Sequence, residues 1–170
     1  MSVEIKQAAS LSAEEWERLF GWGEDIFGAD DLNLSWRAKD WHFLIYEDGE
    51  PVSHAAVLKH TIAVAEKPVV VGGVGGVVTH ERAQGKGYAR TLMRKVADFL
   101  ENEWRVEAGL LFCLPRMIPF YQSLGWQRVN EPVYIEQPSG RIESPMGVMV
   151  LPFGENKWQA GQVELNSFPW

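Results

Sequence analysis

Hydrophobic and polar positions along the first half of the chain fall into short runs that predict β-strands. Residues 41–47, 52–64 and 69–79 are mostly apolar and rich in β-branched side chains, as expected for buried or half-buried strands. The dipeptide Asp48-Gly49 separates the first two runs and is typical of a two-residue hairpin turn. These segments therefore predict neighbouring antiparallel strands.

Two other segments have helical spacing. Ser12 and Glu15 form the signature of a capping box, which predicts a helix from residue 13 to residue 19 or beyond. Residues 88–104 predict a second helix, because their apolar side chains recur at intervals of three and four positions. This apolar stripe consists of Ala89, Leu92, Met93, Val96, Phe99, Leu100 and Trp104. We expect it to pack against the sheet.

The second half of the chain continues with shorter elements. Residues 108–114 predict a buried strand and residues 117–124 a short helix, and further strands are predicted at 126–129 and 147–151. A segment rich in Pro, Ser and Gly at residues 138–145 predicts a loop. The sequence therefore predicts an α/β fold, with a central mixed, mostly antiparallel sheet flanked by helices.

Length and composition fit this fold and exclude several classes of protein. A chain of 170 residues with 46% hydrophobic residues is long enough for one core and short for two, so residues 1–170 are expected to form a single domain. No signal peptide is apparent, and no apolar run approaches the roughly 18 residues of a membrane span. Cys113 is the only cysteine, which excludes an internal disulfide and suits a reducing compartment. We expect a cytoplasmic protein with no membrane partner.

Charge is distributed unevenly along the chain. The net charge of −7 argues against a nucleic-acid partner. Residues 12–50 contain eleven acids and three bases, whereas residues 82–96 contain five bases and no acid. The first sector is suited to a cation and the second to an anion, although solvated helix faces would give the same clusters. No metal site is expected, because His54 and His60 share strand parity but have no third ligand at metal-like spacing.

The most specific signal is Arg-Ala-Gln-Gly-Lys-Gly at residues 82–87, between a predicted strand and a predicted helix. Backbone N–H groups and the helix dipole converge at such a junction, and glycines let an anion approach the main chain. A nucleotide P-loop is excluded, because Gly87 follows Lys86 where that motif needs Ser or Thr. An ordinary glycine-rich turn is the alternative. The flanking strand and helix favour a site for the phosphates of a cofactor.

Two motifs resemble elements of the GNAT superfamily of N-acetyltransferases. Residues 82–87 match the pattern R-x-x-G-x-G/A of the loop that holds the pyrophosphate of acetyl-CoA in that superfamily. Residues 120–126, Phe-Tyr-Gln-Ser-Leu-Gly-Trp, resemble the helix that follows its fifth strand. Residues 54–57, 150–152 and 158–161 more loosely resemble the aminoglycoside 2'-N-acetyltransferase branch. The resemblance implies a GNAT fold and direct transfer of acetyl from acetyl-CoA to an amine.

The resemblance also implies roles for individual residues. Tyr121 would be the general acid that protonates the departing thiolate, and a tyrosine packed against the sheet is the alternative. Backbone groups of Val77, Val78 and Thr79 would bind the pantetheine arm and the acetyl carbonyl. The residues implied to surround the pyrophosphate are Arg82, Gln84, Gly85, Lys86, Gly87, Tyr88, Ala89 and Arg90.

The group that deprotonates the acceptor amine is harder to place. Gly75 stands where the aminoglycoside branch has a glutamate, and residues 69–79 contain no carboxylate. His80 is the nearest titratable side chain and is our candidate base, with a surface histidine at a strand end as the alternative. Cys113 is interpreted as a small buried hydrophobe rather than a nucleophile.

The acidic sector and two tryptophans indicate an acceptor site. The residues expected to line it are Asp30, Asp31, Trp36, Gly75, Glu143 and Trp170, the last also through its C-terminal carboxylate. The prediction is an N-acetyltransferase acting on a primary amine of a small cationic acceptor, aminoglycoside-like or polyamine-like. A catalytically silent acyl-CoA-binding sensor or scaffold is the alternative. The sequence leaves a homodimer open.

Overall fold

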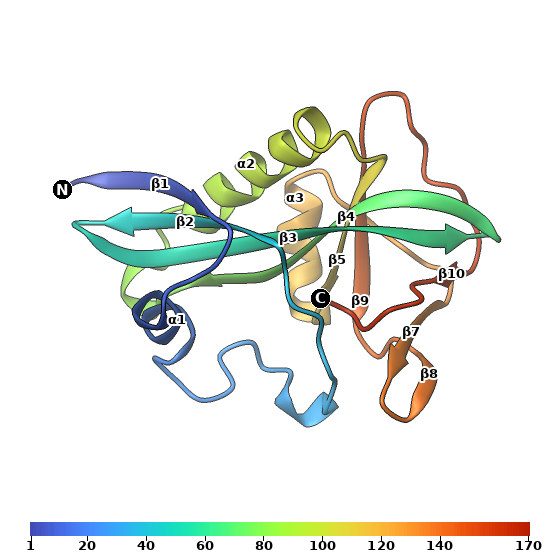
Figure 1. Cartoon of the computed structure of the whole chain (residues 1–170), viewed down its shortest axis with the longest axis horizontal. Helices are drawn as coiled ribbons and strands as arrows, with labels where there is room; N and C mark the ends of the chain where they lie inside the picture. Colours follow the sequence, from blue (N-terminus) through green and yellow to red (C-terminus); the bar gives the residue numbers. More distant parts are fainter.

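The hydrophobic runs form the strands of one mixed sheet in a computed structural model that describes residues 1–170 (Figure 1). The strands are β1 (Val3–Ala8), β2 (Trp41–Glu47), β3 (Glu50–Val64), β4 (Lys67–Thr79), β5 (Ala108–Cys113), β6 (Gln127–Arg128), β7 (Val133–Gln137), β8 (Gly140–Glu143), β9 (Gly147–Pro152) and β10 (Val163–Glu164). The helices are α1 (Ala13–Phe20), α2 (Tyr88–Asn102) and α3 (Ile118–Ser123), with short 3₁₀ turns η1 (Asp30–Leu32), η2 (Glu81–Ala83) and η3 (Pro115–Met117). None of the helices combines the length and apolar character that crossing a membrane requires.

The pairing of the strands confirms the predicted fold class. Antiparallel pairing joins β1, β2, β3 and β4 in chain order, and β4 then pairs in parallel with β5. Beyond β5 the sheet continues antiparallel through β9 to β6. The far end of β3 pairs with β10, which adds β7 in parallel and then β8 antiparallel. Only β4–β5 and β10–β7 are parallel, so the sheet is mixed and mostly antiparallel.

The helices cover both faces of the sheet. The apolar stripe of α2 packs on one face, in a core that it shares with Ile118 and Tyr121 of α3 and with Phe43 of β2. On the opposite face, Leu19 of α1 packs against Leu44 of β2. Figure 1 shows α1 and α2 on opposite sides of the long β3–β4 ribbon. Different helices therefore cover the two faces of the sheet next to β4.

The predicted helix starts are confirmed. The Ser12 hydroxyl accepts the N–H of Glu15 at 3.0 Å, and the Glu15 carboxylate accepts the N–H of Ser12 at 2.8 Å, which completes the capping box of α1. The second helix begins at Tyr88, where the strand–loop–helix pattern places it. Its N-cap is Gly87, with φ of +80°, a conformation that glycine adopts without strain.

One expectation about the last third of the chain is wrong. Residues 138–145 do not form a single loop, because they contain a hairpin turn and the whole of β8. Arg141 of β8 forms an ion pair with Glu164 of β10, and its guanidinium lies 3.7 Å from the ring centre of Tyr134 of β7. Both partners lie outside β8. Local composition could not distinguish a strand of only four residues, next to a Pro-Ser turn, from a loop.

Candidate active site

The site begins where β4 and β5 separate. The two parallel strands are paired only from Val71 with Ala108 to Val74 with Leu111. Beyond the last pair, β4 runs on to Thr79 and β5 ends without further pairing to it. The separated ends leave an opening at which a ligand can reach backbone groups of both strands.

A β-bulge in β4 lies at this opening. The register between β3 and β4 shifts between His54 and Ala56, and the bulge includes Gly76, with φ of +61°. A side chain at Gly76 would be strained by that φ, and its Cβ would lie only 3.0 Å from Cε1 of His54. Because a bulge bends its strand and increases the local twist, it turns the end of β4 away from β5.

Two histidines hold the bulge in place. His54 Nδ1 lies 2.6 Å from the carbonyl oxygen of Gly76, and since a carbonyl only accepts, Nδ1 carries the proton. His54 Nε2 therefore accepts a hydrogen bond from Nδ1–H of His42, at 2.8 Å. Burial lowers the pKa of His54 to about 4 and also lowers the pKa of His42, so both rings are neutral at pH 7. With the Gly76 carbonyl held toward His54, the N–H of Val77 in the same trans peptide points the opposite way.

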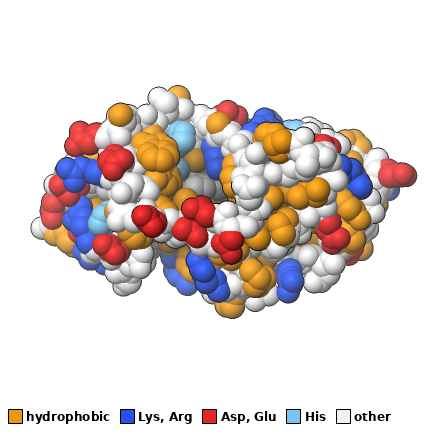
Figure 2. Space-filling view, turned by 90° about the horizontal axis from the view of Figure 1, so that it is seen from below, with side chains coloured by type: hydrophobic (Ala, Val, Ile, Leu, Met, Phe, Trp, Pro, Cys, Tyr) orange, Lys and Arg blue, Asp and Glu red, His pale blue; other side chains and the backbone are white.

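A cavity of about 1600 Å³ spans the opening between β4 and β5. Its lining comes from residues 9–39, which we call the acceptor segment, from the end of β4, from the loop before α2, and from β5 and α3. A typical pocket for one small ligand holds roughly 300–1,000 Å³, so this cavity has room for two ligands together. Figure 2 shows the hollow on the molecular surface, with hydrophobic side chains around it and acidic side chains along one rim. The predicted backbone positions Val77, Val78 and Thr79 all line it.

One end of the cavity presents main-chain N–H groups suited to an anion. Gly85 has φ of +81°, and a Cβ at Gly85 or Gly87 would meet no other atom, so the backbone there is open to a ligand. The amides of Gly85, Lys86 and Gly87 make no backbone hydrogen bond, and no side chain caps α2. Together with the helix dipole, these amides are suited to hold an anion. The residues of this region that line the cavity are Gln84, Gly85, Gly87, Tyr88, Ala89 and Arg90.

Two basic residues of the loop are engaged elsewhere. Arg82 forms an ion pair with Glu50 at 2.7 Å, and Lys86 forms one with Glu47 at 2.9 Å. The hydroxyl of Tyr88 and the ammonium of Lys86 both donate to Glu47, which lowers the pKa of this carboxyl. Neither Arg82 nor Lys86 lines the cavity. The structure thus brings the glycines and amides of the loop to the site, but not these two cations.

Tyr121 reaches the cavity from α3. Its side chain is 5% exposed and packs edge-on against Phe120 and Trp126. Burial raises the pKa of its hydroxyl, and the nearby Cys113 adds to the shift, so the group keeps its proton at neutral pH. It can therefore donate that proton to a leaving group in the cavity. Burial also raises the pKa of the Cys113 thiol to about 11, which leaves almost no thiolate at neutral pH.

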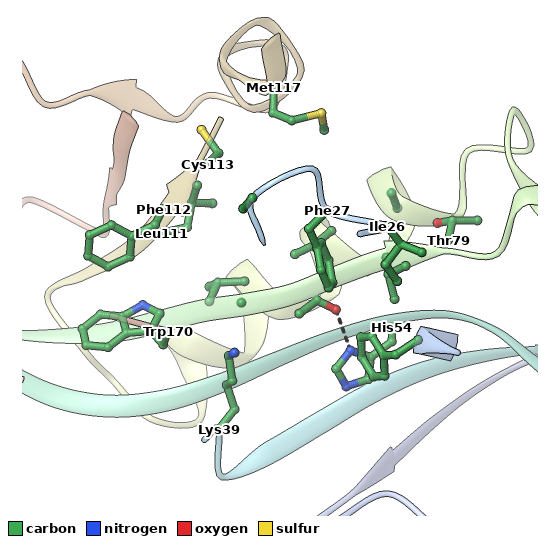
Figure 3. A pocket seen from close by; sticks show the side chains of 18 of the residues that line it. Ile26, Phe27, Lys39, His54, Thr79, Leu111, Phe112, Cys113, Met117 and Trp170 are labelled. Carbon is green, nitrogen blue, oxygen red and sulfur yellow. Dashed lines mark hydrogen bonds between the residues drawn. The ribbon is translucent and has the colours of Figure 1, made fainter. Parts of the chain in front are cut away.

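Lys39 is a site residue that the sequence did not reveal. It precedes β2, and its Nζ points into the cavity between Trp170 and His54 (Figure 3). Its side chain fills the space beside Gly75, where a Cβ would lie 2.5 Å from Lys39 Cε. Burial lowers the pKa of its ammonium to about 8. Local sequence does not distinguish it from a surface lysine, because only the fold brings it to Gly75.

Comparison with known proteins establishes the family. Residues 9–129 match the acetyltransferase (GNAT) domain. The chain belongs to the GNAT acetyltransferase family. Aminoglycoside 2'-N-acetyltransferase from Mycolicibacterium fortuitum is 28% identical to it over 135 residues, which are 76% of this chain and 68% of that relative.

Solved GNAT structures share the fold at low sequence identity. YhbS, a GNAT family N-acetyltransferase from Escherichia coli in complex with CoA, has a TM-score of 0.61 at 15% identity, with coverage of 98% of this chain and 92% of that one. A GNAT family acetyltransferase from Brucella melitensis in complex with acetyl-CoA has a TM-score of 0.56 at 16% identity and covers 94% of each chain. These likenesses confirm the GNAT fold.

Only some of the acidic residues predicted for the acceptor site of this GNAT domain line the cavity. Asp30 and Trp36 line the cavity, as does Asp25. The pKa of the Asp30 carboxyl is raised, first by the neighbouring charge of Asp25. Asp31 and Glu143 do not line the cavity. The acidic part of the site is therefore smaller than the sequence suggests.

The placement of Trp170 and His80 does not fully fit the roles predicted for them. The main chain of Trp170 lies beside Gly75, but its indole is 2% exposed and donates to the carbonyl oxygen of Leu110 at 3.0 Å. Trp170 therefore lines the cavity as predicted, but its ring is a core group with little open surface for an acceptor. His80 lies at the start of η2, where its Nδ1 accepts the N–H of Arg82 at 3.2 Å, and it does not line the cavity. This placement gives His80 no support as the base.

Proposed function

We propose that this GNAT domain transfers an acetyl group from acetyl-CoA to a primary amine of a small acceptor. The observation that carries the proposal is one continuous cavity, which runs from the amides of Gly85 and Gly87 past the bulge at Gly76 to the acceptor segment, with Tyr121 on its wall. The open backbone and free amides of the loop fit a pyrophosphate. Neighbours of the same fold are described in complex with CoA or acetyl-CoA, which supports the same cofactor here.

Acetyl-CoA supplies an acetyl group activated as a thioester. A bond forms between the amine nitrogen and the acetyl carbonyl carbon, and the bond from that carbon to sulfur breaks. Tyr121 donates its proton to the departing sulfur and recovers one from solvent, while the nitrogen releases a proton, so atoms and charge balance. The N–H of Val77, directed by the His54–Gly76 hydrogen bond, is the backbone donor proposed for the carbonyl oxygen.

Lys39 is the proposed acceptor of the proton that the nitrogen releases. An alkyl-ammonium with a pKa of about 10.4 must lose a proton before it attacks, and β4 carries no carboxylate to take it. Lys39 lies beside Gly75, and with a pKa of about 8 part of its population is neutral at pH 7. The protonated fraction of Lys39 also promotes deprotonation of the acceptor, because a positive charge lowers the pKa of an ammonium group beside it.

The acceptor is proposed to be cationic at neutral pH. Asp25 and Asp30 line the cavity and attract an ammonium group from solvent. Two observations support an acceptor that resembles an aminoglycoside or a polyamine: the acidic Asp30 lines the cavity, and the relative from Mycolicibacterium fortuitum is an aminoglycoside 2'-N-acetyltransferase. The aromatic lining of the acceptor segment supports an apolar body instead.

A catalytically silent acyl-CoA-binding sensor or scaffold is the second candidate function. The absence of a carboxylate from β4 favours it, since an amine without a proton acceptor reacts slowly. The buried, protonated Tyr121 and the lysine beside Gly75 favour the enzyme. The two functions share the cofactor site and differ only in amine-dependent turnover.

Two measurements on the purified protein test the proposal. Calorimetry with acetyl-CoA measures cofactor binding, and thiol release from acetyl-CoA across a panel of primary amines measures turnover. We expect binding together with thiol release that depends on the amine, and an acetylated amine identified by mass spectrometry. Binding without release from any amine would support the silent binder. No binding would contradict both functions.

A further inference from the structure

The acceptor segment places aromatic rings around its half of the cavity. Five aromatic side chains of this segment line it: Trp16, Phe20, Trp22, Phe27 and Trp36. Three of them remain accessible to solvent, since Trp16 is 56% exposed, Phe27 43% and Trp36 41%. A single exposed aromatic residue needs no explanation, but three around one cavity mark a surface that an apolar ligand covers.

Few charged groups share this half of the cavity. Its carboxylate side chains are Asp25 and Asp30, both exposed, and the terminal main-chain carbonyl carbon of Trp170 lies beside Gly75 and Lys39. Lys39 is the one cation that the acceptor segment contributes, and Arg116, which also lines the cavity, donates to the carbonyl oxygen of Phe27. Beside β4 the titratable neighbours are Lys39, His42 and His54, and burial keeps the two histidines neutral. Among side chains, a second ammonium group near the reacting nitrogen would therefore meet Lys39 rather than a carboxylate.

We propose that the acceptor subsite binds a primary monoamine whose body is an aromatic ring or an alkyl chain. This inference rests on the proposed function and names the acceptor class. The exposed rings of Trp16, Phe27 and Trp36 cover the apolar body, while Asp25 and Asp30 attract the ammonium group from solvent. An aminoglycoside would bury many hydroxyl groups against these rings without hydrogen-bond partners, which is unfavourable. A polyamine would bring extra charges that the subsite does not pair.

The first arm of the test compares acceptors by thiol release at one pH and saturating acetyl-CoA. The probes are 2-phenylethylamine and hexylamine as apolar monoamines, spermidine and kanamycin as polycations, and ethylamine as a monoamine without a large body. We expect kcat/KM for the two apolar monoamines to exceed the values for spermidine and kanamycin at least tenfold. The reverse order would overturn the inference.

The second arm uses variants of the exposed rings. Trp36→Ala and Phe27→Ala each remove apolar surface, so each should raise KM for 2-phenylethylamine about tenfold. KM for ethylamine should change less than twofold, because ethylamine does not reach these rings. Phe168→Ala is the matched control, since Phe168 is 36% exposed and does not line the cavity. Equal effects of Trp36→Ala on all amines, or none on 2-phenylethylamine, would contradict the subsite.

A binding measurement separates this inference from the proposed function. If no amine releases thiol, calorimetry of 2-phenylethylamine and spermidine in the presence of CoA still compares the two classes. Tighter binding of 2-phenylethylamine, weakened by Trp36→Ala, would support the apolar subsite in a protein that is not an acetyltransferase. Tighter binding of spermidine, or no binding of 2-phenylethylamine, would overturn the subsite even in an active enzyme.

Discussion

The cofactor end and the acceptor end of the cavity are built in different ways. At the cofactor end, a contiguous run from Gln84 to Arg90 supplies glycines, free amides and a helix start within seven neighbouring positions. At the acceptor end, rings from the acceptor segment meet Lys39 and two histidines, which come from separate strands and turns. The backbone forms the first end, and side chains from distant positions form the second.

This difference explains what each end can be expected to do. A backbone site recognises a group common to many ligands, such as a phosphate, and its chemistry hardly depends on side-chain identity. A site made of side chains changes with every substitution. The Gly75 position illustrates this, because β4 offers no side chain there and Lys39, from outside the strand, fills the space beside it. The two ends can therefore be tested separately by substitution.

The largest effect is expected from a charge at the cofactor end. Gly87→Asp should weaken acetyl-CoA binding by about 10³-fold. A carboxylate that lies about 4 Å from a phosphate in a partly exposed site is repelled by ~4 kcal/mol. The fold should persist with some loss of stability, because a Cβ at Gly87 meets no other atom although the φ of +80° strains a side chain. Calorimetry measures the affinity, and circular dichroism checks the fold.

Gly87→Asn is the matched control for this substitution. Asparagine has nearly the shape of aspartate and tolerates positive φ, but carries no charge. It should weaken binding far less than Gly87→Asp does. Similar losses from both variants would indicate that shape, and not charge, governs the loop.

A smaller but still large effect is expected from Tyr121→Phe, which tests the group shared by the two ends. The ring keeps its contacts with Phe120 and Trp126, so only the hydroxyl is lost. If Tyr121 is the general acid, kcat should fall about 10²-fold while the dissociation constant for acetyl-CoA hardly changes. Stopped-flow or steady-state thiol release measures kcat. A change within a factor of two, with chemistry rate-limiting, would leave Tyr121 as a packing residue.

Local patterns in the sequence were sufficient for much of the fold and for the strand–loop–helix junction before α2. The bounds of β2, the capping box at Ser12 and the start of α2 at Tyr88 all depend on residues close together in the chain. The β8 hairpin was not predicted, because a strand of four residues shows little alternation and the Pro and Ser at its turn indicated a loop.

Local sequence patterns did not predict the acceptor end. Lys39 and His54 acquire their roles only when the fold brings them to glycines of β4. His80 was chosen because it is near β4 in sequence, yet its side chain turns to the N–H of Arg82. Sequence proximity identified a candidate, whereas burial and contact in the folded chain decide which group lies in the cavity.

The smallest effects are expected from substitution of Lys39. Both the stability of the protein and its activity should depend on the protonation of this side chain. The folded-state pKa of about 8 lies below the ordinary value of 10.5, so the unfolded state binds more protons between these pH values. The stability penalty of the buried ammonium is thus fully present below pH 8 and declines as pH rises toward 10.5. Lys39→Met should raise Tm by a few °C at pH 7, since about 1 kcal/mol shifts Tm by roughly 2–4 °C at this size.

In activity, we expect kcat/KM of the wild type to rise through pH 8, and Lys39→Met should remove this rise and leave only the rise caused by ionisation of the acceptor. Lys67→Met is the control, because Lys67 is exposed at the start of β4 and should change neither profile. A lower Tm of Lys39→Met at pH 7 would mean that a carboxyl group pairs with Lys39 and keeps it charged. An unchanged pH profile would mean that the proton leaves the acceptor by another route, and the acceptor end would then resemble the cofactor end in using backbone and solvent alone.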